Sequence, residues 1–143
     1  MSQTALSEPV AGAAPLAAHR PLNAAVGTAI GATAIGAFLP WASVGSLSFN
    51  GTEGGGLLNL ILAGIGMTAL LVARGRRWGM LLNVVTAALA ALIVAVNLSD
   101  VERFADSIGT VSTGIGLWIS LVGTVAWLIV SVVGLFRRRR PSA

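Results

Sequence analysis

Four long apolar stretches without a single ionisable side chain constrain this chain most strongly. They run over residues 22–39, 56–73, 79–96 and 115–136, and none contains Asp, Glu, Lys, Arg or His. A helix of about 18 residues covers about 27 Å, close to the hydrocarbon thickness of a bilayer at about 30 Å. A helix also pairs its backbone polar groups internally, which a lipid-exposed loop or strand does not. The sequence therefore predicts the all-α class, an integral membrane four-helix bundle with short outer loops.

A water-soluble four-helix bundle is the competing interpretation of these stretches. Helices of a soluble bundle carry a charged outer face, and none of the four stretches has one. Only 10% of the 143 residues are charged, against about a quarter in a typical soluble domain. The composition therefore argues for the membrane.

The arginines predict how the chain is threaded through the bilayer. All nine cations are arginines, and short loops rich in arginine stay on the cytoplasmic side of a membrane. With four crossings, one side holds eight of them and the opposite side holds Arg103 alone, beside four acidic residues. The eight, expected to contact lipid headgroups, are Arg20, Arg74, Arg76, Arg77, Arg137, Arg138, Arg139 and Arg140. We predict a multi-pass protein of the cell (plasma) membrane with both termini cytoplasmic.

This threading divides the chain into three parts. Residues 1–21 are rich in Ala, Pro and Ser and are expected to form a flexible cytoplasmic tail. Residues 22–136 hold the four-helix bundle, and residues 137–143 form a basic cytoplasmic tail. The basic runs lack the interleaved aromatic residues of nucleic-acid-binding proteins, so no nucleic-acid partner is expected.

Tryptophans are expected at the edges of the bilayer, where an indole prefers to lie. Trp41 and Trp118 fall at the predicted outer boundary and Trp78 at the inner one. Trp127 falls near the middle of the last stretch instead. We expect it to pack between helices with its N–H donating to a carbonyl or hydroxyl.

Small residues at four-residue spacing predict close helix packing. Such positions let two backbones approach, which matters because lipid supplies no hydrophobic drive between helices. They face either another helix of the same bundle or a second copy of the chain, with the first favoured because Gly and Ala are abundant throughout. The residues are Gly27 and Gly31, and Gly36 with Ala32 four residues before it, in the first stretch, and Gly116 and Ser120 in the fourth.

The polar residues inside the stretches are all uncharged. Side chains of this kind form hydrogen bonds across helices or line a narrow pore, and pores usually show rings of charge or aligned carbonyls as well. The first role is therefore favoured. The residues are Asn23, Thr28, Thr33, Asn59, Thr68, Asn83, Thr86, Ser120, Thr124 and Ser131.

Two outer loops carry local structure signals. Residues 41–55 predict a short hairpin over the outer mouth, turning at Asn50-Gly51. Ser99 and Glu102 form a capping box. The pattern that follows predicts a separate amphipathic helix on the membrane surface, ending at Gly109.

No arrangement of residues indicates catalysis. The chain has no cysteine, its one histidine (His19) lies in the predicted tail, and no stretch holds an acid or base. Proton-coupled carriers need such groups inside the membrane. We therefore expect no enzyme, no catalytic residues, no metal site and no cofactor.

Several short motifs resemble a group of small, uncharacterised four-span membrane proteins of actinobacteria. They are Leu39-Pro40-Trp41 with the Ser/Gly-rich loop after it, the arginine cluster before the third stretch, and Gly114-Ile-Gly-Leu-Trp118. The resemblance covers about residues 22–136. It implies location and architecture and carries no activity or functional residue.

The leading functional hypothesis is a non-enzymatic accessory or scaffold subunit of a membrane complex. Its partners would be the lipid bilayer and either other membrane protein subunits or a second copy of itself. The alternative is a passive pore or holin-like oligomer, suggested by the small size, the basic tail and the polar residues. A third hypothesis, that the outer loops sense a ligand, rests only on the existence of those loops.

Overall fold

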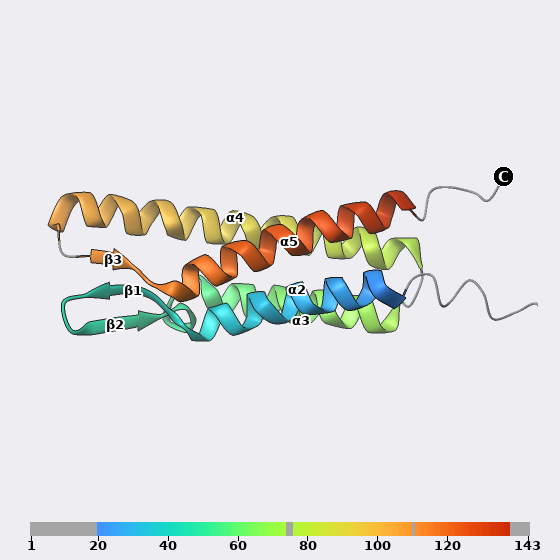
Figure 1. Ribbon diagram of the computed structural model, residues 1–143, viewed down its shortest axis with the longest axis horizontal. Coiled ribbons are helices and arrows are strands. Elements are labelled where there is room, and N and C mark those ends of the chain that lie inside the picture. Colours follow the sequence, from blue (N-terminus) through green and yellow to red (C-terminus); the bar gives the residue numbers. More distant parts are fainter. Residues whose placement is uncertain (1–19, 74–75, 110, 138–143) are drawn as a thin grey trace, which may run out of the picture.

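Four helices lie side by side in this protein, and a small sheet caps one end of them (Figure 1). A computed structural model describes residues 20–73, 76–109 and 111–137. The helices are α2 (Arg20–Phe38), α3 (Gly56–Val72), α4 (Arg77–Ile108) and α5 (Ile115–Arg137). The predicted four-helix packing is confirmed, whereas the sheet makes the prediction of a purely α-helical fold incomplete.

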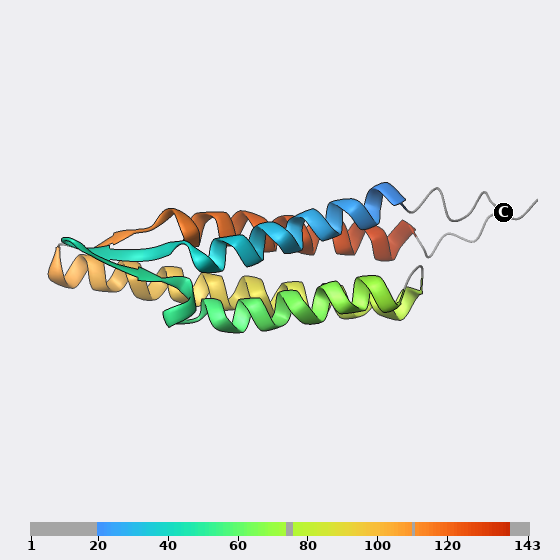
Figure 2. The same ribbon diagram turned by 90° about the horizontal axis from the view of Figure 1, so that it is seen from below.

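Successive helices run in opposite directions, so α3 and α5 are parallel to each other (Figures 1 and 2). The ends of α2, α3, α4 and α5 that border Arg20, Ala73, Arg77 and Arg137 lie together, opposite the sheet. We call this the arginine end, and the other the sheet end. The termini of the described chain therefore lie on the same side of the bundle.

The predicted tails differ slightly from the observed helix ends. Arg20 and Pro21 belong to α2, and a proline is tolerated in the first turn because its missing N–H has no partner there anyway. Arg137 is the last residue of α5 and not the first of a tail. Residues 1–19 and 138–143 of those tails lie outside the described residues.

Helix α4 is one continuous helix of 32 residues, about 48 Å long at 1.5 Å per residue. The prediction of a separate surface helix starting at Ser99 is wrong. The Ser99 hydroxyl donates to the Ala95 carbonyl oxygen at 3.0 Å, a bond within the helix that replaces the expected cap. The helix ends at Gly109 as predicted, because Gly109 adopts a left-handed conformation with φ of 70°.

The sheet has three short antiparallel strands in the order β2-β1-β3. They are β1 (Pro40–Val44), β2 (Leu47–Asn50) and β3 (Val111–Thr113), and a 3₁₀ turn, Gly51–Glu53, follows β2. The hairpin was predicted, but its turn lies at Gly45-Ser46 and not at Asn50-Gly51. Gly45 has φ of +59°, which a two-residue turn with glycine first requires.

The outside of the bundle is apolar, and its core combines apolar side chains with buried polar ones. Large apolar side chains such as Ile61, Leu92 and Ile129 are more than half exposed along the helices. Seven polar side chains are buried instead: Thr33, Asn59, Asn83, Thr86, Ser120, Thr124 and Ser131. A helix in water buries its apolar face, so this pattern is that of a bundle surrounded by lipid.

Among the described residues, three helices are long and apolar enough to cross a membrane: Pro21–Phe38, Arg77–Ser107 and Ile115–Arg137. Helix α3 is apolar over its 17 residues but shorter. The chain therefore has the features of a multi-pass membrane protein.

The bond of Ser99 within α4 predicts that Ser99→Ala changes the free energy of unfolding by less than about 0.5 kcal/mol. Loss of a true N-cap costs about 1 kcal/mol. The comparison variant Gly109→Ala should cost about 1–2 kcal/mol, because alanine is strained at positive φ. Unfolding in mixed detergent micelles measures both. A larger loss for Ser99→Ala than for Gly109→Ala would contradict the continuous helix.

Candidate functional site

The centre of the bundle is built in layers seven residues apart. Seven residues nearly complete two turns, so such positions stay on one helix face. On α3 this face includes Asn59 and Gly66, and on α5 it includes Ser120 and Trp127. Because α3 and α5 run parallel, a shift of seven residues moves both helices to the same neighbouring layer.

The middle layer is organised by Trp127. Its indole is fully buried and its Nε1 donates to Asn83 Oδ1 at 3.0 Å. The Asn83 amide in turn donates from Nδ2 to the Gly79 carbonyl oxygen at 3.0 Å. The expectation that Trp127 packs between helices with its N–H on a carbonyl is confirmed. This pair joins α5 to α4 through the core.

Gly66 on α3 makes room for that indole. A Cβ atom at Gly66 would overlap the Trp127 ring and lie 3.3 Å from Asn83 Oδ1. One glycine thus lets a large side chain reach across the bundle from α5. The ring fills the core at this level, which blocks a passage along the axis of a single bundle.

The next layer toward the sheet end contains Asn59 and Ser120. Both side chains are fully buried. Asn59 Nδ2, Asn59 Oδ1 and Ser120 Oγ have no hydrogen-bond partner among the residues that the structure describes. Leaving such a group unpaired in an apolar environment costs about 1–3 kcal/mol in proteins. These are the unpaired buried side-chain atoms in the half of the described core nearer the sheet end.

Most other buried hydroxyls bond within their own helix, contrary to the expected bonds across helices. Thr33, Thr86 and Thr124 each donate to the carbonyl oxygen four residues earlier, at 2.9–3.0 Å. A threonine hydroxyl reaches this carbonyl without help from another helix. The hydrogen bond of Trp127 with Asn83, in contrast, joins two helices.

The predicted small packing residues divide into two groups. Gly36, Gly116 and Ser120 meet where α2 contacts α5: a Cβ at Gly36 would overlap Ser120 Oγ, and one at Gly116 would lie 2.8 Å from the Gly36 carbonyl oxygen. Gly27 makes only ordinary contact, 3.7 Å from Leu70, and nothing lies within 4 Å at Gly31. Of the predicted small residues, those at the sheet end of α2 and the start of α5 therefore make the close contacts.

Three other glycines make equally close helix contacts that the four-residue spacing did not reveal. A Cβ at Gly123 would lie 2.8 Å from the Thr33 backbone nitrogen, and one at Gly134 would lie 2.7 Å from Met80 and Leu22. Gly66 is the third. Along α5, Gly123 follows Gly116 by seven residues and Gly134 follows Gly123 by eleven, whereas Gly66 lies on α3. A spacing of seven residues was therefore the usable signal on α5.

The predicted boundary residues lie as follows. Trp78 and Trp118 are about half exposed, at the arginine end and the sheet end respectively. Trp41 is buried instead, and its Nε1 donates to the Gly36 carbonyl oxygen at 2.9 Å. It packs with Val94 and Leu117 under the sheet, so its contacts are with protein.

Of the five arginines that the structure describes, four lie at the arginine end of the bundle, and Arg103 lies in the last third of α4 at the sheet end. Arg20 starts α2, while Arg76, Arg77 and Arg137 lie at the neighbouring helix ends. The last three have exposed side chains. His19, Arg74, Arg138, Arg139 and Arg140 lie outside the described residues.

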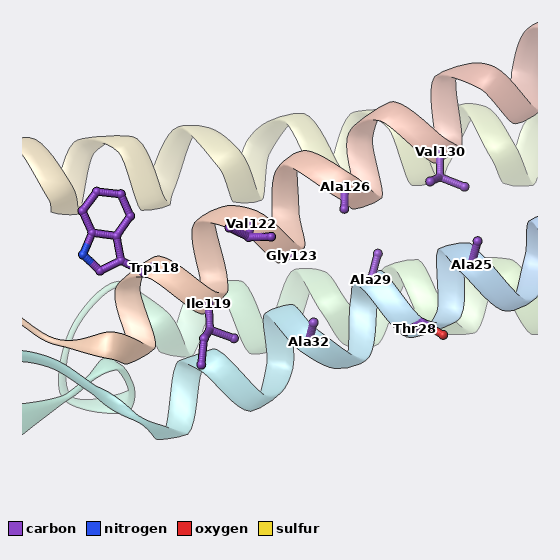
Figure 3. Close-up of a pocket in the computed structure, with 10 residues that line it drawn as sticks. All are labelled: Ala25, Thr28, Ala29, Ala32, Trp118, Ile119, Val122, Gly123, Ala126 and Val130. Atoms are coloured by element: carbon purple, nitrogen blue, oxygen red, sulfur yellow. The ribbon is translucent and has the colours of Figure 1, made fainter.

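A groove of about 580 Å³ opens sideways between α2 and α5 (Figure 3). Short side chains on α2, Ala25, Ala29 and Ala32, leave the space beneath Val122 and Val130 of α5. Its lining is almost entirely apolar, as expected of a surface that faces acyl chains. It runs along the bundle surface and does not cross the core.

The sheet is fixed to the bundle by several short contacts. The Gly114 N–H, just before α5, donates to the Trp41 carbonyl oxygen of β1 at 2.8 Å. Within the sheet, the hydroxyls of Ser43 and Ser112 lie 2.8 Å apart across β1 and β3. The sheet and the last third of α4 together form what we call the cap, residues 40–53, 97–109 and 111–113. Among the described residues, no group of three His, Cys, Asp or Glu side chains lies close enough to hold a metal ion.

Comparisons with protein-family models, with curated proteins and with solved structures found no significant match to this chain.

The contact between Trp127 and Gly66 predicts that Gly66→Ala destabilises the protein by about 1–3 kcal/mol through overpacking. The matched control Gly31→Ala meets open space and should be neutral or stabilising by up to about 1 kcal/mol, since alanine favours a helix. Unfolding in mixed micelles measures both variants. Equal stability of the two variants would contradict the layered core.

Proposed function

We propose that the chain crosses the membrane four times, with α3 as the fourth span. Helix α3 covers about 26 Å with its 17 residues and carries no charge. It lies alongside the three candidate spans over most of their length (Figure 2). A helix packed there shares their depth, and the bilayer thins slightly to match a short span.

The arginine end lies in the cytoplasm in this proposal. The described arginines at that end contrast with Asp100, Glu102 and Asp106 at the sheet end. The positive-inside rule orients such a protein with both termini cytoplasmic in the plasma membrane. The cap then projects outside the cell.

The protein acts, in this proposal, as a non-enzymatic accessory or scaffold subunit that binds a membrane partner through the cap. One observation carries this idea. Helix α4, at about 48 Å, exceeds the hydrocarbon thickness by about 18 Å, so its charged last third and the sheet stand outside the lipid. There Leu47, Phe49 and Phe104 are 65%, 48% and 61% exposed.

Exposed large apolar side chains beyond the lipid belt are typical of an interaction surface. All four residues of β2 are exposed, and Leu47 and Phe49 alternate along it, so they share one face. The resemblance to small actinobacterial four-span proteins supports the membrane location and supplies no activity. The filled core at Trp127 favours this role over that of a pore through one bundle.

The threading predicts that single cysteines at Ser48 and Ser107 react with a membrane-impermeant maleimide on intact cells. A cysteine at Ser7 should react only after permeabilisation. The chain has no native cysteine, so each variant reports one position. If α3 did not cross the membrane, only α4 would separate the two positions, and the cysteines at Ser48 and Ser107 would be labelled from opposite sides. Labelling of the Ser7 variant alone on intact cells would show that the orientation is opposite to the proposed one.

The scaffold role predicts that a partner co-purifies in near-stoichiometric amount with the tagged protein from its native membrane in mild detergent. The double variant Leu47→Ser/Phe49→Ser should reduce that yield at least tenfold, because it removes both apolar contacts of β2. Ser48→Ala, on the opposite face of the strand, is the matched control. Recovery of a lone monomer in all cases, or ion leakage from liposomes holding the purified protein, would contradict the proposal.

A further inference from the structure

The Asn59 amide is the most unusual polar group in the described chain. Its side chain is completely buried, and both of its polar atoms lack a partner among the residues described. Asn83 is buried to the same extent one layer away, yet both of its polar atoms are paired. Burial alone therefore does not explain the unpaired state of Asn59.

Small side chains occupy several core positions at the level of Asn59. Asn59 lies seven residues before Gly66, and Ser120 lies seven residues before Trp127, so the two residues occupy the same level of the parallel helices α3 and α5. The same spacing places Ala90 of α4 at this level. Where the neighbouring layer is filled by an indole, this one has an amide, a hydroxyl and methyl groups.

The polar atoms of this layer suit one small hydrogen-bonding ligand. Asn59 offers two N–H donors and a carbonyl acceptor, and the Ser120 hydroxyl, which lies against Gly36, offers a donor and an acceptor. A buried water molecule typically makes two to four hydrogen bonds to groups that are otherwise unpaired. No charged side chain lies in the layer to neutralise an ion, so a neutral ligand fits best.

The sheet end supplies the approach to this layer. The Asn97 amide, half-buried on α4, lies against Gly55, one helical turn before Asn59. Asn97 Nδ2 donates to the Ile93 carbonyl oxygen at 2.7 Å. A polar side chain thus stands between the Asn59 layer and the surface of the cap.

We propose that Asn59 binds an internal water molecule in the outer half of the core, with the Ser120 hydroxyl as its second ligand. The site exchanges with bulk water at the sheet end, past Asn97. It is a hydrated polar site inside a bundle whose middle layer is dry and filled. This inference does not depend on the scaffold role of the cap.

Nuclear magnetic resonance of the full chain in lipid nanodiscs tests this site. The chain has only five asparagines, so selective ¹⁵N-asparagine labelling yields five side-chain amide signals, and loss of one in Asn59→Leu assigns Asn59. If that variant does not fold, Asn59→Gln serves instead, because the unlabelled glutamine also removes the Asn59 signal. We expect a rotating-frame Overhauser cross-peak from water to the Asn59 amide hydrogens, with the sign that separates it from chemical exchange.

The internal control is the Trp127 indole N–H, observed in uniformly labelled protein. It is equally buried but bonded to Asn83, and it should show no water cross-peak. Ser120→Ala should weaken the Asn59 cross-peak at least twofold. Absence of the Asn59 cross-peak would overturn the water site, and an unchanged cross-peak in Ser120→Ala would overturn Ser120 as its second ligand.

Discussion

The close approach of helix backbones is the interaction on which this structure depends. Lipid surrounds apolar side chains as readily as protein does, so burial of large apolar residues does not hold membrane helices together. Contact must come from tight packing at small residues. Gly36 against Ser120, Gly123 against Thr33, and Gly66 against Trp127 provide such contacts at three levels. These small residues already hold the helix backbones close together. The remaining core positions can therefore be polar without loss of contact between the helices.

The ends of the helices were largely readable from the sequence, because local chemistry determines them. Pro40 ends α2 and Gly109 ends α4. The extent of each stretch without ionisable residues predicts the other helix ends. The errors lie where two local signals compete. Ser99 and Glu102 matched a helix start, yet no glycine or proline interrupts the chain before them, so α4 continues. Asn50-Gly51 and Gly45-Ser46 both suit a turn, and pairing of β1 with both β2 and β3 selects the second.

The core site was less predictable, because it depends on how helices are aligned. The need of Trp127 for a buried acceptor followed from its position, but its partner Asn83 is 44 residues away. Only the packing of α4 against α5 brings them together. The threonines looked like equal candidates for bonds between helices, yet each reaches a carbonyl of its own helix. Asn59 stands out only when its neighbours are known.

The chemistry of the core also bears on where the function of this protein lies. Amides and hydroxyls bind neutral ligands. They carry no charge to balance an ion in lipid, and they do not ionise near neutral pH. An ion inside this single bundle would lose its hydration and meet no opposite charge, which is costly. The cap has the opposite character, with acidic residues and exposed apolar side chains. We therefore infer that the bundle positions the cap, and that recognition takes place there.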